Sequence, residues 1–139
     1  KYDFDVTGTD ISQSAIEKAK KLSNEINFLV DDVLNSKLPD KKFDFILDRG
    51  IFHIFEISQR SQYVKQIKRI LNDNGILFLK CMSVEEENLP DNDMPHKLSK
   101  QEITDSFNAD FDIQKIEDSE FHGALEFYPK ALFTVLKKK

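Results

Sequence analysis

Three apolar runs in the first half of the chain each stop at an aspartate. The first run ends at Asp10, the second at Asp32 and the third at Asp48. Parallel strands joined by crossover connections point the same way, so in one parallel sheet these carboxylates share an edge. That edge is where open α/β sheets bind their ligands. The pattern therefore predicts an α/β fold with a ligand site at the carboxyl ends of its strands.

Helical spacing of apolar residues appears in three other segments. Apolar side chains recur three or four positions apart after Ser12, over 58–71 and after Ser99, which predicts three helices. Ser12 and Ser99 are placed to cap the first turns, and Glu102 completes a capping box with Ser99. We expect the pair at 74–75, Asn-Gly, to end the second helix.

The second half of the chain supplies the remaining strands. The run over 75–82 is nearly all apolar, as expected for a strand that is buried on both faces. Residues 83–96 have no apolar period and predict a long loop. The runs over 111–121 and 130–139 have no helical pattern between them, which indicates an antiparallel pair. We expect one domain over 1–139, with a mostly parallel sheet and residues 131–136 antiparallel to their neighbours.

Composition excludes several classes of protein. With 139 residues, 40% hydrophobic and 32% charged, the chain fits one globular domain. No apolar run approaches the roughly 20 residues that span a bilayer, so we expect a cytoplasmic protein with no membrane partner. A net charge of −5 argues against a nucleic-acid partner that is held by general electrostatic attraction. We interpret the single cysteine, Cys81, as a buried apolar residue, and the lysines at 137–139 as a solvated tail.

The order of elements and four motifs resemble the class I S-adenosylmethionine-dependent methyltransferases, from the second strand of that family onward. The segment "VTGTDISQSAIEKAK" resembles the family's segment after motif I, and "FLVDDVLN" resembles the segment whose acid reads the adenine. The segment "KFDFILDRGIFHIF" resembles motif IV, and "RILNDNGILFLK" the helix-to-strand segment that follows it. The resemblance implies a Rossmann-like three-layer sandwich and S-adenosylmethionine as the cofactor.

One further feature narrows this resemblance to a branch of the family, and another departs from the family pattern. The triplet "DRG" at 48–50, together with "MPHKLSKQEI", is similar to the thiopurine and thiol methyltransferase branch, which implies a small acceptor. The glycine-rich turn of motif I, the first strand and its helix have no counterpart in the sequence. The strands that end at Asp10 and Asp48 are therefore expected to have unpaired inner edges, and we expect an amino-terminal extension that supplies the strand and the turn.

The resemblance implies roles for five cofactor-binding residues. Asp10 would hold the ribose hydroxyls with Ile11 beside it, although the residues alone leave open whether Asp10 only favours the helix that follows. Asp32 would read the adenine with Val33 next to the base, or it is a solvated loop acid. Asp48 is expected to contact ligand or to cap the segment after its strand.

Four other residues are candidates for the acceptor side of the site. Arg49 is either a surface charge or a guanidinium that orients an anionic or thiolate acceptor. His53 is a candidate catalytic base, with a satisfied core histidine as the more common alternative. Phe52 and Phe55 are expected in the core, with lining of the acceptor pocket as the alternative. The sequence shows no metal-ligand spacing among its three histidines.

Three functions fit these observations. The first is methyl transfer to a small-molecule acceptor by a monomer or a dimer. The second is a fragment of an NAD(P)-dependent oxidoreductase, since such folds also place an acid after their second strand. The third is a non-catalytic binding domain that keeps the methyltransferase fold. An antiparallel final strand would favour the first over the second.

Overall fold

The computed structural model describes residues 3–90, 94–124 and 126–139. Contacts divide the chain into two compact units, one through Leu38 and one from Pro39 onward, and each is described by itself. The elements of the first unit are β1 (Thr7–Asp10), α1 (Gln13–Leu22), β2 (Asn27–Val30) and the short 3-10 turn η1 (Val33–Asn35).

The first unit is a strand-helix-strand element. β1 and β2 are parallel, with Asp10 opposite Val30. Helix α1 begins where predicted, because the Ser12 hydroxyl accepts the Ala15 N–H and satisfies one of the free donors of the first turn. Ile16 is the buried residue of this helix. The predicted parallel arrangement of the first two strands is confirmed.

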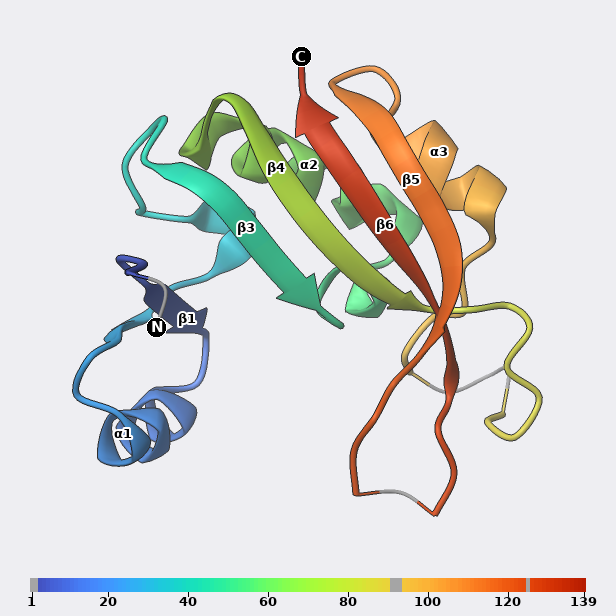
Figure 1. Cartoon of the computed structure of the whole chain (residues 1–139), viewed down its shortest axis with the longest axis horizontal. Helices are drawn as coiled ribbons and strands as arrows, with labels where there is room; N and C mark the ends of the chain where they lie inside the picture. Colours follow the sequence, from blue (N-terminus) through green and yellow to red (C-terminus); the bar gives the residue numbers. More distant parts are fainter. Residues whose placement is uncertain (1–2, 91–93, 125) are drawn as a thin grey trace. The chain divides into compact units, whose positions relative to one another are not determined.

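The second unit contains one four-stranded sheet with the order β3-β4-β6-β5 (Figure 1). Its elements are β3 (Phe43–Arg49), the 3-10 turn η2 (Phe52–Ile54), α2 (Ile57–Ile70), β4 (Leu71–Met82), α3 (Lys100–Phe107), β5 (Phe111–Glu120) and β6 (Lys130–Lys138). β3 and β4 are parallel, whereas β6 is antiparallel to both β4 and β5. The predicted antiparallel final strand is confirmed, which favours a methyltransferase over an oxidoreductase.

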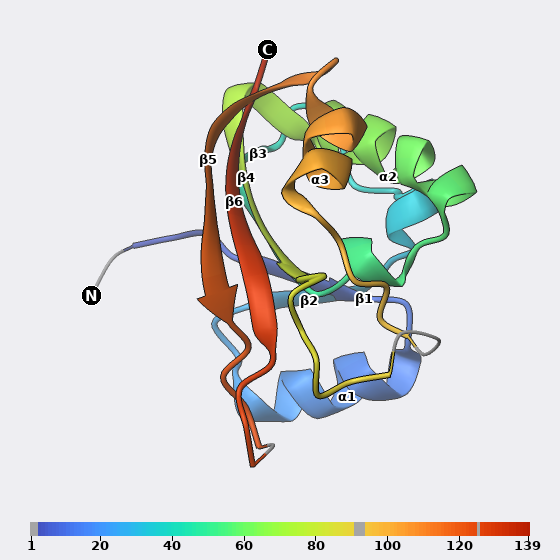
Figure 2. The ribbon, with the colours of Figure 1, turned by 90° about the vertical axis from the view of Figure 1, so that its right-hand side faces the viewer.

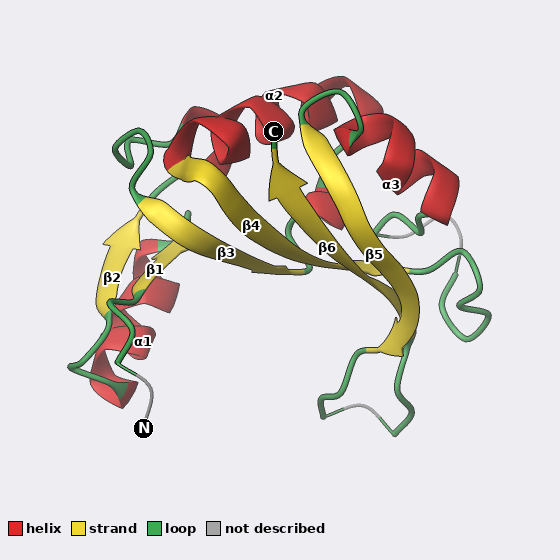
Figure 3. Ribbon diagram, turned by 45° about the horizontal axis from the view of Figure 1, so that its top comes forward, coloured by secondary structure: helices red, strands yellow, loops and turns green. Residues whose placement is uncertain are grey.

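Helices α2 and α3 cover the same face of this sheet (Figures 2 and 3). The side chains between sheet and helices form the core, where Tyr63, Phe52 and Phe107 are fully buried and their rings are in contact. Ser99 and Glu102 make the predicted capping box at the start of α3. Because successive side chains of a strand point to opposite faces of the sheet, every second side chain enters this layer.

The opposite face of the sheet carries a second set of apolar side chains. The rings of Phe45, Phe78 and Phe133 stack across three strands, with centroid distances of 6.1 and 6.3 Å. Phe45 is 52% exposed and Leu47 is 72% exposed. Within this unit no described helix covers that face (Figure 2). These exposures are high for a strand of an α/β fold, because such sheets are normally buried on both faces.

Three expectations from the sequence are corrected. The described strands form two sheets instead of one mixed sheet, although β1 and β3 each have an edge without a described partner strand, as expected. Helix α2 ends at Ile70, before the predicted Asn-Gly signal. Asn74, with φ of 62°, lies inside β4, where it forms part of an irregularity in the pairing with β3. Asn tolerates this left-handed conformation better than most residues.

The lysine-rich end of the chain is the third correction. Lys138 belongs to β6 and is 7% exposed, so it is not part of a solvated tail. Its ammonium donates to the Leu71 carbonyl at 2.7 Å and lies 3.6 Å from Asp73. A buried ammonium persists only where acceptors compensate its lost hydration. Sequence position suggested a tail, but strand pairing places this residue against the core.

Candidate functional site

Asp10 lies at the carboxyl end of β1 and is exposed. One of its carboxylate oxygens accepts the Ser12 N–H at 2.7 Å. No described residue donates to the other oxygen. One oxygen therefore supports the start of α1 and the second is open to solvent, and the role of Asp10 in holding the ribose stays a prediction. Ile11, the next residue, is 71% exposed, so its side chain is also available to a ligand.

Asp32 follows the adjacent parallel strand and caps η1. Its carboxylate accepts the Leu34 N–H at 3.0 Å and the Asn35 side-chain amide at 3.1 Å. Val33 is half-buried beside it. Asp10 and Asp32 thus stand at the carboxyl ends of neighbouring parallel strands, as the sequence predicts. Asp32 is more fully engaged by its own chain than Asp10.

Asp48 is buried, and its carboxylate is satisfied within the second unit. It accepts the N–H groups of Ile51 at 2.6 Å and Phe52 at 2.9 Å, and the Tyr63 hydroxyl at 2.6 Å. Burial raises the pKa of Asp48 above its usual value, and these hydrogen bonds oppose the rise. The side chain therefore fixes the turn after β3, and this geometry favours the capping alternative. Direct contact with cofactor stays a prediction.

Arg49 points away from the helix-covered face. It is exposed, and its guanidinium donates to the His122 carbonyl at 2.5 Å. The guanidinium carbon also lies 5.4 Å from the centroid of the Phe121 ring. One donor and one face of this cation are thus anchored to the loop after β5. The remaining N–H groups of Arg49 can still meet an acceptor at the carboxyl end of β3.

His53 is 6% exposed, and both sides of its ring are occupied. Nδ1 accepts the Met82 N–H at 2.8 Å, and the ring also bonds the Gly50 backbone. Burial lowers the pKa of His53 to about 4, with a smaller contribution from His96. The imidazole is neutral at pH 7 and holds the turn after β3 against β4. This geometry favours the core-histidine alternative, and the role of catalytic base stays a prediction.

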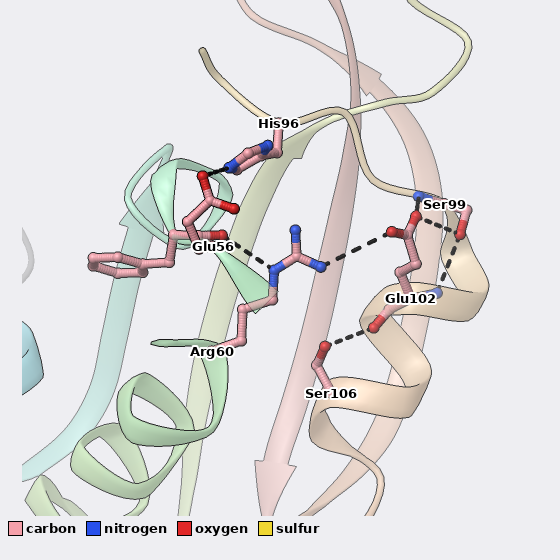
Figure 4. Close-up of polar contacts among 7 residues, drawn as sticks. Glu56, Arg60, His96, Ser99, Glu102 and Ser106 are labelled. Carbon is pink, nitrogen blue, oxygen red and sulfur yellow. Dashed lines mark hydrogen bonds and ion pairs between the residues drawn. The ribbon is translucent and has the colours of Figure 1, made fainter. Parts of the chain in front are cut away.

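A polar network ties the start of α2 to α3 (Figure 4). The Arg60 guanidinium donates to the Phe55 carbonyl at 3.3 Å and lies 3.9 Å from the Glu102 carboxylate. His96 lies 3.4 Å from the Glu56 carboxylate, and its backbone N–H donates to the His53 carbonyl. The loop before α3 is thus fastened to the turn after β3.

Phe52 and Phe55 are 0% and 8% exposed, so both belong to the core. The alternative that they line an acceptor pocket is not favoured. Cys81 is also fully buried, and burial raises its pKa well above the usual value. A thiol in this state is a poor nucleophile, because the thiolate is the reactive form.

A cleft of about 930 Å³ lies where β4 and β5 end and β6 and α3 begin. Its lining combines hydroxyl, basic and acidic side chains with three apolar residues: Ser83, Val84, Glu85, Ser99, Lys100, Asp118, Ser119, Glu120, His122, Lys130, Ala131 and Leu132. None of the site residues predicted from the sequence lines this cleft. Lys100 and Asp118 form an ion pair of 3.0 Å within it.

Five residues that contribute to these arrangements were not identified from the sequence: Tyr63, Arg60, Lys80, Phe121 and Glu102 as a partner of Arg60. Tyr63 and Arg60 carry one weak signal, since polar residues on the apolar face of a predicted helix need buried partners. Lys80 interrupts an apolar strand, which is a similar signal. Phe121 has no sequence signal, because its position depends on how the strands pair.

Neither a metal centre nor a membrane span is found in the described part of the chain. No group of three or more metal-ligating side chains gathers among residues 3–90, 94–124 and 126–139. None of the helices within those ranges is long and apolar enough to cross a membrane.

Comparison with known proteins identifies the family. The family described as "Methyltransferase domain" matches residues 1–79, which is more than half of the chain. The chain belongs to the class I S-adenosylmethionine-dependent methyltransferases. The matched segment contains all the candidate site residues that were predicted from the sequence. The narrower assignment to the thiopurine and thiol branch is a proposal.

Two relatives and one solved structure illustrate the similarity. EEF1A lysine methyltransferase 2 of Homo sapiens is 34% identical over 101 residues, which cover 63% of this chain and 42% of that protein. The probable tRNA methyltransferase 9B of Bos taurus is 26% identical over 113 residues, which cover 81% of this chain and 23% of that protein. The chain therefore spans less than half the length of these relatives.

The structural comparison is with a SAM-dependent methyltransferase of Methanosarcina mazei. The TM-score is 0.80 at 17% identity, over 96% of this chain and 81% of that chain. This similarity confirms the Rossmann-like methyltransferase fold predicted from the sequence.

Proposed function

We propose that the complete protein transfers a methyl group from S-adenosylmethionine to a small acceptor that carries a thiol or a similar nucleophile. The position and the free carboxylate oxygen of Asp10 are the observation that supports this proposal most directly. Asp10 stands at the carboxyl end of a parallel strand with one oxygen anchored by Ser12 and the other exposed. A carboxylate in this state can accept hydrogen bonds from vicinal hydroxyls, and charged acceptors form strong hydrogen bonds.

The neighbouring residues fit the same cofactor. Ile11 offers an exposed apolar surface beside Asp10, and the half-buried Val33 offers a smaller one beside Asp32. Asp32 has a carboxylate that would accept from an exocyclic amino group while it caps η1. These four residues would hold the nucleoside part of S-adenosylmethionine. When bound, this cofactor supplies an electrophilic methyl group for in-line displacement by a nucleophile.

The second unit supplies the groups proposed for the acceptor. Arg49 keeps free N–H donors at the end of β3 and would orient an anionic acceptor. A nearby guanidinium lowers the pKa of a thiol and so increases its reactive thiolate fraction. His53 is neutral and its ring is occupied, so a thiol acceptor that ionises without a strong base suits this unit best. Asp48 fixes the turn that carries His53 and that begins directly after Arg49.

We propose further that the complete protein adds a strand and a glycine-rich turn before the present sequence. β1 and β3 each have one edge without a described partner, and Phe45 and Leu47 on β3 are largely exposed. A strand pairing with β3 would satisfy its free backbone groups, each of which costs about 1–3 kcal/mol when buried without a partner. The turn would hold the methionine end of the cofactor.

Isothermal titration with S-adenosylmethionine, S-adenosylhomocysteine and NAD tests these proposals. We expect the extended protein to bind the first two and not NAD. Binding of NAD alone would indicate an oxidoreductase, and binding of none would indicate a non-catalytic domain. The present chain should bind S-adenosylmethionine at least about tenfold more weakly than the extended protein, equivalent to about 1.4 kcal/mol. Equal affinities would contradict the proposed added strand.

A further inference from the structure

Two neighbouring cations lie near the carboxyl ends of β3 and β4, on the face of the sheet that α2 and α3 leave uncovered. Arg49 on β3 and Lys80 on β4 are direct partners in the parallel register of these strands. Their side chains share one aromatic neighbour, because the Lys80 ammonium and the Arg49 guanidinium carbon each lie 5.4 Å from the centroid of Phe121. Side chains at paired positions of adjacent strands point to the same face.

The positive charge of this pair is poorly compensated. The Lys80 ammonium has no hydrogen-bond or ion-pair partner among the described residues. Arg49 donates one of its N–H groups to the His122 carbonyl. Partial burial and the charge of Arg49 lower the pKa of Lys80, while Glu120 opposes this shift. The ring centroid of His53 lies 5.7 Å from that of Phe121, but His53 adds no charge because its imidazole is neutral. Two adjacent cations without a bound acid favour an anion between them.

We propose that Arg49, Lys80 and Phe121 form a recognition site for the carboxylate or thiolate of a small acceptor. This inference rests on the proposed function, since it assigns the acceptor's charge to a place in the second unit. The planar guanidinium of Arg49 matches a two-oxygen anion, and Lys80 adds a point charge that attracts it without fixing its orientation. Phe121 holds both cations in place and gives the site an apolar wall.

The surrounding charges argue for a small anion in this site. Glu120 opposes the shift of the Lys80 pKa, and Glu117 lies in the strand row of Lys80, because both residues pair with Phe133 of β6. Glu117 also forms an ion pair of 2.6 Å with Lys115. A long polyanion would have to pass these acids, and the whole chain carries a net charge of −5. A single carboxylate or thiolate needs to reach only Arg49 and Lys80.

Benzoate is a suitable probe, and benzamide is its neutral counterpart. In spectra of backbone amides from the full chain, benzoate should shift the signals of Arg49, Lys80 and Phe121, and benzamide should not. Lys80→Gln should weaken benzoate binding by about fivefold or more, as expected for loss of one charged partner, and Lys80→Arg should restore most of it. Glu120→Gln should strengthen binding, because it removes the opposing charge.

Lys115→Gln is the matched control, because Lys115 lies on the same face but is paired with Glu117. It should leave benzoate affinity unchanged. Equal affinity in the parent and Lys80→Gln, equal shifts with benzamide, or no binding of benzoate would each overturn the proposal. Titration of the extended protein with S-adenosylhomocysteine separates the two proposals. If S-adenosylhomocysteine binds and benzoate does not, only the proposed anion site is wrong. If benzoate binds and S-adenosylhomocysteine does not, only the proposed methyltransferase activity is refuted.

Discussion

The Tyr63 hydroxyl donates to the Asp48 carboxylate at 2.6 Å, inside the layer between α2 and β3. Together with the N–H groups of Ile51 and Phe52, it satisfies a carboxylate that burial would otherwise destabilise. The turn that follows β3 is thus held by a buried carboxyl group that makes three hydrogen bonds. Both candidate acceptor residues, Arg49 and His53, depend on this turn for their positions.

Tyr63→Phe should therefore destabilise the protein. The substitution keeps the ring packing but leaves Asp48 with one donor fewer in a buried environment. We expect the free energy of unfolding in urea to fall by about 1–3 kcal/mol. Tyr128→Phe is the control, since Tyr128 is 51% exposed and its ring contacts that of His122 at a tilt, with the ring centroids 4.3 Å apart. An equal, small effect of both substitutions would show that the Asp48 contact contributes little.

His53 should make stability depend on pH between about 4 and 6.5. Its pKa is about 4 in the folded protein and 6.5 in the reference state, so the unfolded chain binds a proton in this window that the folded chain does not. Stability from this group is present above pH 6.5 and is lost as the pH falls to about 4, by up to about 3 kcal/mol.

The measurement compares urea unfolding across this pH range in the parent and in His53→Gln. The slope in the parent should exceed that of the variant, and the comparison cancels the opposite contribution of Asp48, whose pKa is raised. His122→Gln should behave as the parent, because its side chain is 68% exposed. Identical slopes in the parent and His53→Gln would contradict the lowered pKa.

Lys138→Met should destabilise the second unit. The substitution keeps much of the apolar stem but removes the hydrogen bond from the ammonium to the Leu71 carbonyl. Hydrogen bonds that involve a charged group contribute about 1.5–3 kcal/mol, and thermal unfolding should show a loss in this range. Lys137→Met, on the opposite face of β6, should change the melting temperature little. A similar loss in both variants would indicate that strand pairing alone matters.

Asp10→Ala should weaken cofactor binding in the extended protein. Loss of charge-assisted hydrogen bonds to the ribose should raise the dissociation constant for S-adenosylmethionine by an amount equivalent to about 2–3 kcal/mol. Asp5→Ala is the control, because Asp5 is exposed and precedes β1. Unchanged affinity in Asp10→Ala would refute the ribose assignment.

The strand and helix order could be predicted because it depends on local patterns. Apolar alternation, helical spacing and the capping residues Ser12 and Ser99 act within a few positions of each other, and all three predicted helices and the antiparallel β6 are present. The boundary at Asn74 was predicted wrongly because a left-handed residue can end a helix or bend a strand. Only the pairing of Leu71 with Phe43 distinguishes the two.

The site was predictable to the extent that it lies at the ends of strands. Sequence alone placed Asp10 and Asp32 at the carboxyl ends of adjacent parallel strands and identified Arg49 as a cation at such an end. Tertiary structure decided what each side chain touches. It buried Asp48 and His53, paired Arg49 with Lys80, and brought Phe121 from a distant loop to both cations. Hydrogen-bond partners, burial and charge compensation depend on contacts between residues far apart in the chain, which no local pattern encodes.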